Sequence, residues 1–291
     1  MLPELRRGRS ARSCALPLCV ASVFALSACD VKVGEKGMSV GVAREKASEQ
    51  WTRSYSLSPD RRLAVTTFNG STNITGGAGP DTEVRIDREA TAMTKDAARE
   101  LLASASIAET TDAEGINIEV QRKDSGPGFR PLSIRTNIRV PRGVKLIVRM
   151  QNGQLTIENV DGELTAAATN GSITGHGISG RLTATVVNGR IAIDLASISG
   201  NVQLTSTNGG IGIGVPEDLN ADFDLMATNG GVSIDPQVKL TAKKEEANGG
   251  FFTNRLSGQL NRGGPDITAQ ATNGGVRIGP PGTAASRGRG R

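Results

Sequence analysis

The sequence contains few aromatic residues and a single histidine. Aromatic side chains make up 3% of the 291 residues, with one Trp, one Tyr and one His. A compact core built around Phe and Trp is therefore excluded, and small and β-branched side chains must fill the interior. The lone His176 excludes a multi-histidine metal site and leaves a Ser-His-Asp arrangement dependent on one turn residue.

The apolar run near the N-terminus is too short to cross a bilayer as a helix. It extends from Cys14 to Leu26, follows four Arg residues and ends in Leu26-Ser27-Ala28-Cys29. A basic segment followed by a short apolar core is typical of a secretory signal peptide, and the last four residues resemble the bacterial lipobox. We therefore expect residues 1–28 to be a lipoprotein signal peptide and Cys29 to be the lipidated first residue of the mature chain.

The positions of the cysteines and the distribution of charge restrict where the protein can reside and what it can bind. Cys14 and Cys19 lie in the expected signal peptide, so the mature chain keeps only Cys29 and forms no internal disulfide. Between residues 152 and 278 acidic side chains outnumber basic ones, and no stripe of Lys and Arg is present. Nucleic acid is therefore not expected as a partner. We expect an exported protein, held by its lipid to a membrane of the bacterial cell envelope, on the periplasmic face or at the cell surface.

Glycine is abundant, and it recurs after asparagine. The 37 Gly exceed the usual frequency of about 7% and show no collagen-like period. From Asn152 to Asn273 the spacing of the Asn-Gly pairs averages about 20 residues, a length typical of one repeat in a solenoid. The pairs begin at Asn69, Asn152, Asn170, Asn188, Asn208, Asn229, Asn248 and Asn273.

The residues before each Asn-Gly pair alternate like those of a strand. Leu182, Ala184 and Val186 share the parity of Asn188, which predicts that the Asn faces the core. An antiparallel β-meander also uses Asn-Gly turns and stays open as an alternative. The recurrence of the same Asn favours an all-β, right-handed parallel β-helix or β-solenoid, because like residues then stack between neighbouring rungs. The expected ladder comprises Asn69, Asn152, Asn170, Asn188, Asn208, Asn229 and Asn273.

The rest of the chain divides around these repeats. We expect a flexible tether over residues 29–50, N-terminal rungs and one helix over 51–143, regular repeats over 144–279, and a disordered Gly/Arg tail over 280–291. The helix is predicted from Thr94, its N-cap, to Ile107, with Ala97, Leu101 and Leu102 on one side. At Asn248 the inward parity holds Lys244 and Glu246, which predicts an irregular rung.

These features together resemble a bacterial "putative adhesin" family built of β-strand repeats, a domain of unknown function akin to auto-transporter adhesin head domains. The resemblance covers residues 51 to 278. It rests on the opening residues 51–55, the Phe68-Asn69-Gly70 turn, the helix near Arg99, the run 138–143 and the Asn-Gly repeats. It implies a parallel β-helix or β-roll at the cell envelope and supplies no catalytic residues.

Motifs that could carry chemistry are weak. Residues 175–180 match G-x-G-x-x-G, but strands are expected on both sides, where a dinucleotide site needs a following helix. In residues 209–214, Gly214 stands where a calcium-binding roll would have Asp. A solvated loop is the preferred interpretation of the acidic cluster Glu217, Asp218, Asp222 and Asp224, over a divalent-ion site.

A carbohydrate-active enzyme needs paired carboxylates and aromatic platforms. Asp194 and Asp235 are isolated in the sequence, and the repeats contain no Trp or Tyr. We therefore expect no catalysis, cofactor or metal, and a structural or adhesive role toward an envelope protein or a surface glycan. The alternative is an envelope-stress accessory or regulatory binding module, and a β-helix enzyme is third.

Overall fold

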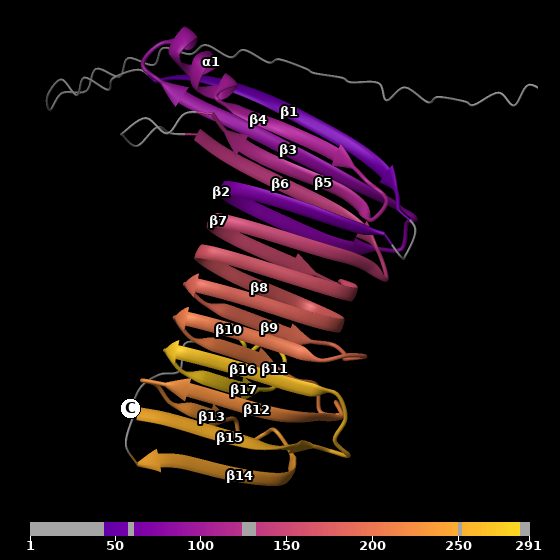
Figure 1. The fold of residues 1–291 in the computed structure, drawn as a ribbon, viewed down its shortest axis with the longest axis vertical. Coiled ribbons are helices and arrows are strands. Elements are labelled where there is room, and N and C mark those ends of the chain that lie inside the picture. The colour runs from indigo at the N-terminus through magenta and orange to yellow at the C-terminus, as the bar shows by residue number, and fades with distance from the viewer. Residues whose placement is uncertain (1–43, 58–60, 124–131, 250–251, 286–291) are drawn as a thin grey trace, which may run out of the picture.

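The strands stack along the long axis of the molecule, with α1 at one end and β14 at the other (Figure 1). The computed structural model describes residues 44–57, 61–123, 132–249 and 252–285. In these residues the fold is all-β with one helix. The elements are β1 Glu45–Ser56, β2 Arg62–Gly77, β3 Asp81–Ala92, α1 Lys95–Ala103, β4 Ala105–Thr111, β5 Gly115–Arg122, β6 Leu132–Pro141, β7 Val144–Glu158, β8 Asp161–Asn188, β9 Ile191–Leu195, β10 Val202–Asn208, β11 Ile211–Gly214, β12 Ala221–Thr228, β13 Val232–Ile234, β14 Leu240–Gly249, β15 Phe252–Leu260, β16 Asp266–Asn273 and β17 Val276–Gly279.

The middle of the molecule, from β7 to β11, is a stack of parallel strands in register. β7 pairs with β8, which places Leu146 opposite Leu164, and β8 pairs onward with β9 and β10. Buried Val, Ile, Leu and Ala alternate with outward side chains along β7, β8 and β10, whereas β9 and β11 are buried on both faces. β-Branched residues pack well on a pleated surface, so this alternation builds a core without aromatic rings. Because every pairing here is parallel, the antiparallel meander does not describe this region.

The N-terminal end is built differently. β2 spans a whole repeat and lies parallel to β7, with Asn69 opposite Asn152 although the two residues are 83 positions apart. β5 adds to the first half of β2 and β6 to its second half, both in parallel. β4, β3 and β1 then continue the two halves in antiparallel pairing. The prediction of stacked rungs over residues 51–143 is therefore wrong for β1, β3 and β4, which close this end of the stack.

The single helix is shorter than predicted. Thr94 is its N-cap, with extended φ and ψ, and its hydroxyl accepts the backbone N–H of Ala97. The buried face carries Ala98, Leu101 and Leu102, whereas Ala97 is exposed. The helix ends at Ala103 because the following residues pair with β5 as strand β4, so the predicted end at Ile107 is wrong.

At the C-terminal end the order of the strands in space differs from their order in the chain. β16 pairs in parallel with both β10 and β12, and β17 pairs in parallel with both β11 and β13. The last repeat is therefore inserted between two earlier ones. β15 and then β14 follow β12 in antiparallel pairing, and Asn248 lies opposite Thr253 in the β14–β15 pair.

Two predicted boundaries are corrected. β1 begins at Glu45, inside the predicted tether, because the backbone from this residue pairs with β3. Residues 280–285, predicted as disordered tail, pack on the stack: Arg190 donates to the carbonyl of Ala284 at 2.6 Å, and Ala284 is buried. The predicted signal peptide, Cys29 and the end of the tail lie outside the described residues. Within the described ranges, none of the helical structure is long and apolar enough to cross a membrane.

Candidate functional site

A column of asparagine side chains runs along one corner of the stack. From Asn152 onward, the side-chain Nδ2 of each Asn donates to Oδ1 of the neighbouring Asn that lies closer to Asn69, at 2.8 to 3.1 Å. All the bonds of the column therefore point in the same direction. Bonds aligned in this way polarise one another. In space the order is Asn69, Asn152, Asn170, Asn188, Asn208, Asn273 and Asn229.

This asparagine ladder lies at the surface rather than in the core. Its members from Asn170 onward are exposed, and Asn69 and Asn152 are half-buried. The alternation stops one step before the turn, since Val186 is buried but Val187 and Asn188 are both exposed. The prediction that each Asn faces the core is therefore wrong, because the backbone has already begun to turn at that residue.

The glycine after each Asn is required by the close approach of neighbouring repeats. A Cβ on Gly189 would lie 1.7 Å from the carbonyl oxygen of Gly171, and one on Gly153 would lie 1.7 Å from that of Gly70. Gly189 also has a φ of 148°, in a region that side chains other than glycine rarely reach. The Asn-Gly pair therefore joins neighbouring repeats through its side chain and its backbone, so its role is structural.

The histidine of the chain is paired with a buried carboxylate. His176 lies opposite Asp194 in the β8–β9 pair, and its Nδ1 is 2.9 Å from Oδ2 of Asp194. The other oxygen, Oδ1, accepts the backbone N–H of Gly282 at 3.1 Å. Gly214 leaves room for this carboxylate, since a Cβ there would lie 2.0 Å from Oδ1. Asp194 is therefore not isolated: it fastens the segment 280–285 to the stack.

The acidic residues between 217 and 224 do not converge on one point. Glu217 pairs with Lys239, and this hydrogen bond and ion pair lower the pKa of Glu217. Asp224 pairs with Arg255 at 2.7 Å. Among the described residues, no group of three or more His, Cys, Asp or Glu is arranged to hold a metal ion.

A groove of about 920 Å³ lies on the outer face of one half of the repeats. It crosses β5, β2, β7 and two successive passes of β8. The side chains alternate with buried ones and therefore project outward into the groove. They are Thr66, Phe68, Glu119, Gln121, Arg149, Gln151, Ala167, Thr169, Thr185 and Val187.

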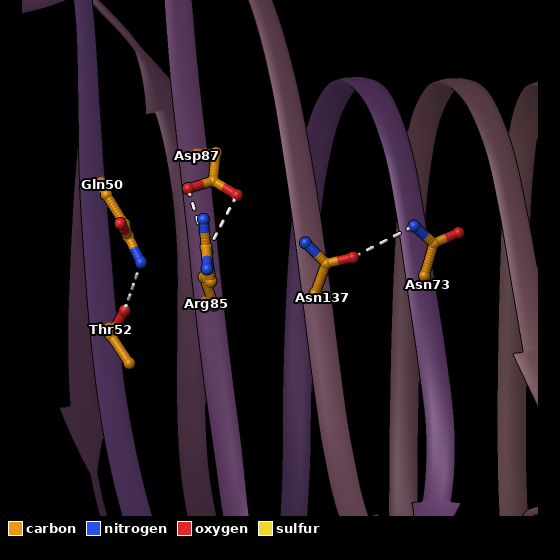
Figure 2. A network of polar contacts seen from close by, with 6 residues as sticks. All are labelled: Gln50, Thr52, Asn73, Arg85, Asp87 and Asn137. Atoms are coloured by element: carbon orange, nitrogen blue, oxygen red, sulfur yellow. Dashed lines mark hydrogen bonds and ion pairs between the residues drawn. The ribbon is translucent and has the colours of Figure 1, made fainter.

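The other half of the repeats carries a polar row near the N-terminal end. Figure 2 shows four strands side by side there, with Thr52 on β1, Arg85 on β3, Asn137 on β6 and Asn73 on β2 in consecutive register. Asn73 donates to Asn137 at 3.1 Å, and Arg85 is bonded to Asp87 on its own strand at 3.1 Å. The Asn73–Asn137 bond joins two strands, whereas Arg85–Asp87 and Gln50–Thr52 are contacts within one strand, so the row consists of local pairs.

Sequence reasoning missed the groove, because its lining comes from segments up to about 120 residues apart that meet only in the fold. Of the predicted site residues, the structure brings together the seven Asn of the ladder in one column. Cys29 lies outside the described residues.

The architecture defines the class: an elongated all-β protein of stacked repeats closed by antiparallel strands. The sequence profile of one family, described as Toastrack DUF4097, matches residues 63–278, and the chain belongs to this family. The resemblance to an adhesin-like domain of unknown function is thereby confirmed.

Several solved structures are similar, at low identity. They include a "putative cell adhesion protein" from Clostridium sporogenes, 12% identical, covering 79% of this chain and 99% of that one with a TM-score of 0.43. A "putative adhesin" from Bacteroides fragilis is 11% identical, with 79% and 96% covered and a TM-score of 0.27. A "putative lipid binding protein" from Parabacteroides distasonis is 9% identical, with 79% and 96% covered and a TM-score of 0.25. No curated protein sequence matches the chain.

Proposed function

We propose that this chain is a lipid-anchored protein of the bacterial cell envelope, a right-handed parallel β-solenoid with a structural or adhesive role and no catalysis. One observation carries the proposal. The repeated residues, Asn and Gly, hold neighbouring repeats together, which leaves the outward side chains of β7, β8 and β10 as an extended, ordered surface. Extended surfaces of stacked repeats are used to bind partners.

The anchor limits how far β1 can lie from the membrane. A lipidated Cys29 precedes β1 by 16 positions, and at about 3.3–3.6 Å per residue this stretch reaches at most about 58 Å. The start of β1 therefore lies within that distance of the bilayer.

Cell fractionation tests the anchor. Cys29→Ala releases the protein from the membrane fraction, whereas Cys19→Ala, a matched change inside the signal peptide, leaves it there. Membrane retention of the Cys29→Ala protein overturns the anchored role.

An attachment assay tests the adhesive role. Deleting the gene lowers the attachment of cells to a surface coated with envelope or host polymer, and expression of the full chain restores it. Unchanged attachment together with altered envelope-stress gene output would replace the adhesive role with the regulatory one.

A further inference from the structure

The outer groove lies in the interior of the sheet, which limits what it can bind. Within it the first half of β2 has β5 on one side and β7 on the other, and β7 has β2 and β8 (Figure 1). The backbone N–H and C=O groups there are therefore paired, and an extended peptide cannot add as a new strand. A ligand must be recognised by side chains.

The groove extends across the strands rather than along one of them. It crosses five neighbouring strand segments, which repeat every 4.7–4.9 Å or so, and each contributes outward side chains. In one row Glu119, Thr66, Arg149 and Ala167 follow one another in register. A linear polymer that lies across the strands can contact one outward side chain from each strand in succession.

The side chains of the groove match a carbohydrate. Gln121, Gln151 and Arg149 offer planar hydrogen-bonding groups, and Thr169 and Thr185 offer hydroxyls. Between them lie the apolar surfaces of Ala167, of Val187, which is 40% exposed, and of the half-buried Phe68, which also packs against the core. Hydroxyl groups alternating with apolar C–H faces are the chemistry of a sugar chain.

The charge of the groove argues against other polymers. Arg122 and Arg149 stand against Glu119, so the lining lacks the cluster of like charges that a polyphosphate or nucleic acid requires. The apolar side chains are too few and scattered for an amphipathic helix. The asparagine ladder borders the groove, where Asn152 donates to Asn69 at 2.8 Å, so this border is fixed before a ligand arrives.

We propose that this groove binds an extended, uncharged glycan chain that lies across β5, β2, β7 and β8. The inference rests on the adhesive role proposed above and names the surface and the ligand class for it. Arg149 and Gln151 provide the main hydrogen bonds, and Phe68 and Val187 contact the sugar faces.

β7 supplies a matched pair of variants for the test. Gln151 and Gln154 are both exposed on this strand, but Gln151 lines the groove and Gln154 does not. Purified mature chain is run through gels containing dextran, mannan or a soluble β-glucan, with double-stranded DNA as the polyanion. We expect retardation by at least one neutral glycan, a 10-fold or greater weakening in the double variant Arg149→Ala, Gln151→Ala, and no change in Gln154→Ala. Circular dichroism checks that each variant is folded.

Three results overturn the inference: no retardation by any of the three glycans, retardation by DNA alone, or equal weakening by Gln154→Ala. The attachment assay separates its failure from that of the adhesive role. If the double variant attaches as well as the unaltered protein while the deletion strain does not attach, the groove is wrong and the adhesive role stands. If the deletion strain attaches normally, the adhesive role is wrong.

Discussion

In the middle of the molecule each repeat pairs with the next one in the chain, whereas at the C-terminal end it does not. β8 follows β7 and β10 follows β8, but the strand beside β10 is β16, and β12 comes only after it. β12 and β16 carry equivalent inward residues, with Leu225 opposite Ala269 in the parallel pair. The pattern of one repeat therefore defines a unit that stacks, but it does not decide which other unit becomes its neighbour.

What distinguishes β12 is its second partner. It pairs antiparallel with β15 over Ala221–Thr228, and β14 adds to β15, so β12 belongs to the antiparallel strands that close this end. β16 has parallel partners on both sides and continues the stack. The N-terminal end is closed in the same way. β2 joins the parallel stack, and antiparallel strands follow its parallel partners β5 and β6.

The largest effect is expected from removing the inserted repeat. A chain truncated after Pro265 lacks β16 and β17, so β12 loses its parallel partner. We expect amide hydrogen exchange to show loss of protection over Ala221–Thr228, while β7 and β8 stay protected. Truncation after Ala285 is the matched control and leaves both regions protected. Persistent protection of β12 in the shorter chain would show that it can dock directly on β10.

The second-largest effect on stability is expected from substituting a glycine at a corner of the stack. In Gly189→Ala the new Cβ meets the Gly171 carbonyl at a backbone φ of 148°, and we expect a loss of about 3 kcal/mol in the free energy of unfolding. Gly231 has open space around its Cβ position, so Gly231→Ala is the control and changes stability by less than about 0.5 kcal/mol. Urea denaturation of both variants measures the difference, and equal midpoints would contradict the close contact.

The asparagine ladder allows a comparison between its middle and its end. Asn188 donates to Asn170 and accepts from Asn208, both at 2.8 Å, whereas Asn229, the last Asn of the ladder among the described side chains, donates to Asn273 at 3.1 Å. We expect Asn188→Ala to cost about 1–2 kcal/mol, near the sum of two surface hydrogen bonds. Asn229→Gly keeps the positive φ of 55° and costs about half as much. Thermal unfolding ranks the two variants, and a larger loss for Asn229→Gly would contradict the idea that the number of ladder bonds sets the contribution of each Asn.

The smallest expected effect is a change in the stability of the fold at acidic pH. The pKa of Asp235 is lowered by the backbone N–H of Gln237 and by the Arg277 side chain, at 3.1 and 2.8 Å. Because the folded value lies below the ordinary 3.8, this carboxylate stabilises the fold above that pH, and the contribution disappears as the pH falls through the folded value. Melting curves of the unaltered chain and of Asp235→Asn should therefore converge below pH 3.8. A constant gap between them at every pH would contradict the ionic role of Asp235.

Sequence reasoning predicted the all-β class and the single helix, because the alternation and the N-cap at Thr94 are local signals. It failed where partners distant in the chain decide the structure. Ile107 fits the spacing of the helix, yet it lies in β4 opposite Val120 because the β5 backbone offers a strand partner. The insertion of β16 was hidden for a similar reason, since β12 and β16 have interchangeable patterns. The groove could not be predicted because no single segment of the sequence contains it.

The inserted repeat also has a consequence for the order of assembly. A growing chain emerges N-terminus first, so the strands from β2 to β11 can stack while the remainder is still being made. β12 cannot take its place until β16 has arrived, and β13 waits for β17. A product cut short before β16 keeps an open strand edge at Val202 and Leu204, and open edges invite aggregation and degradation. Completion of this end of the stack therefore depends on β16 and β17, which come after β12 and β13 in the chain.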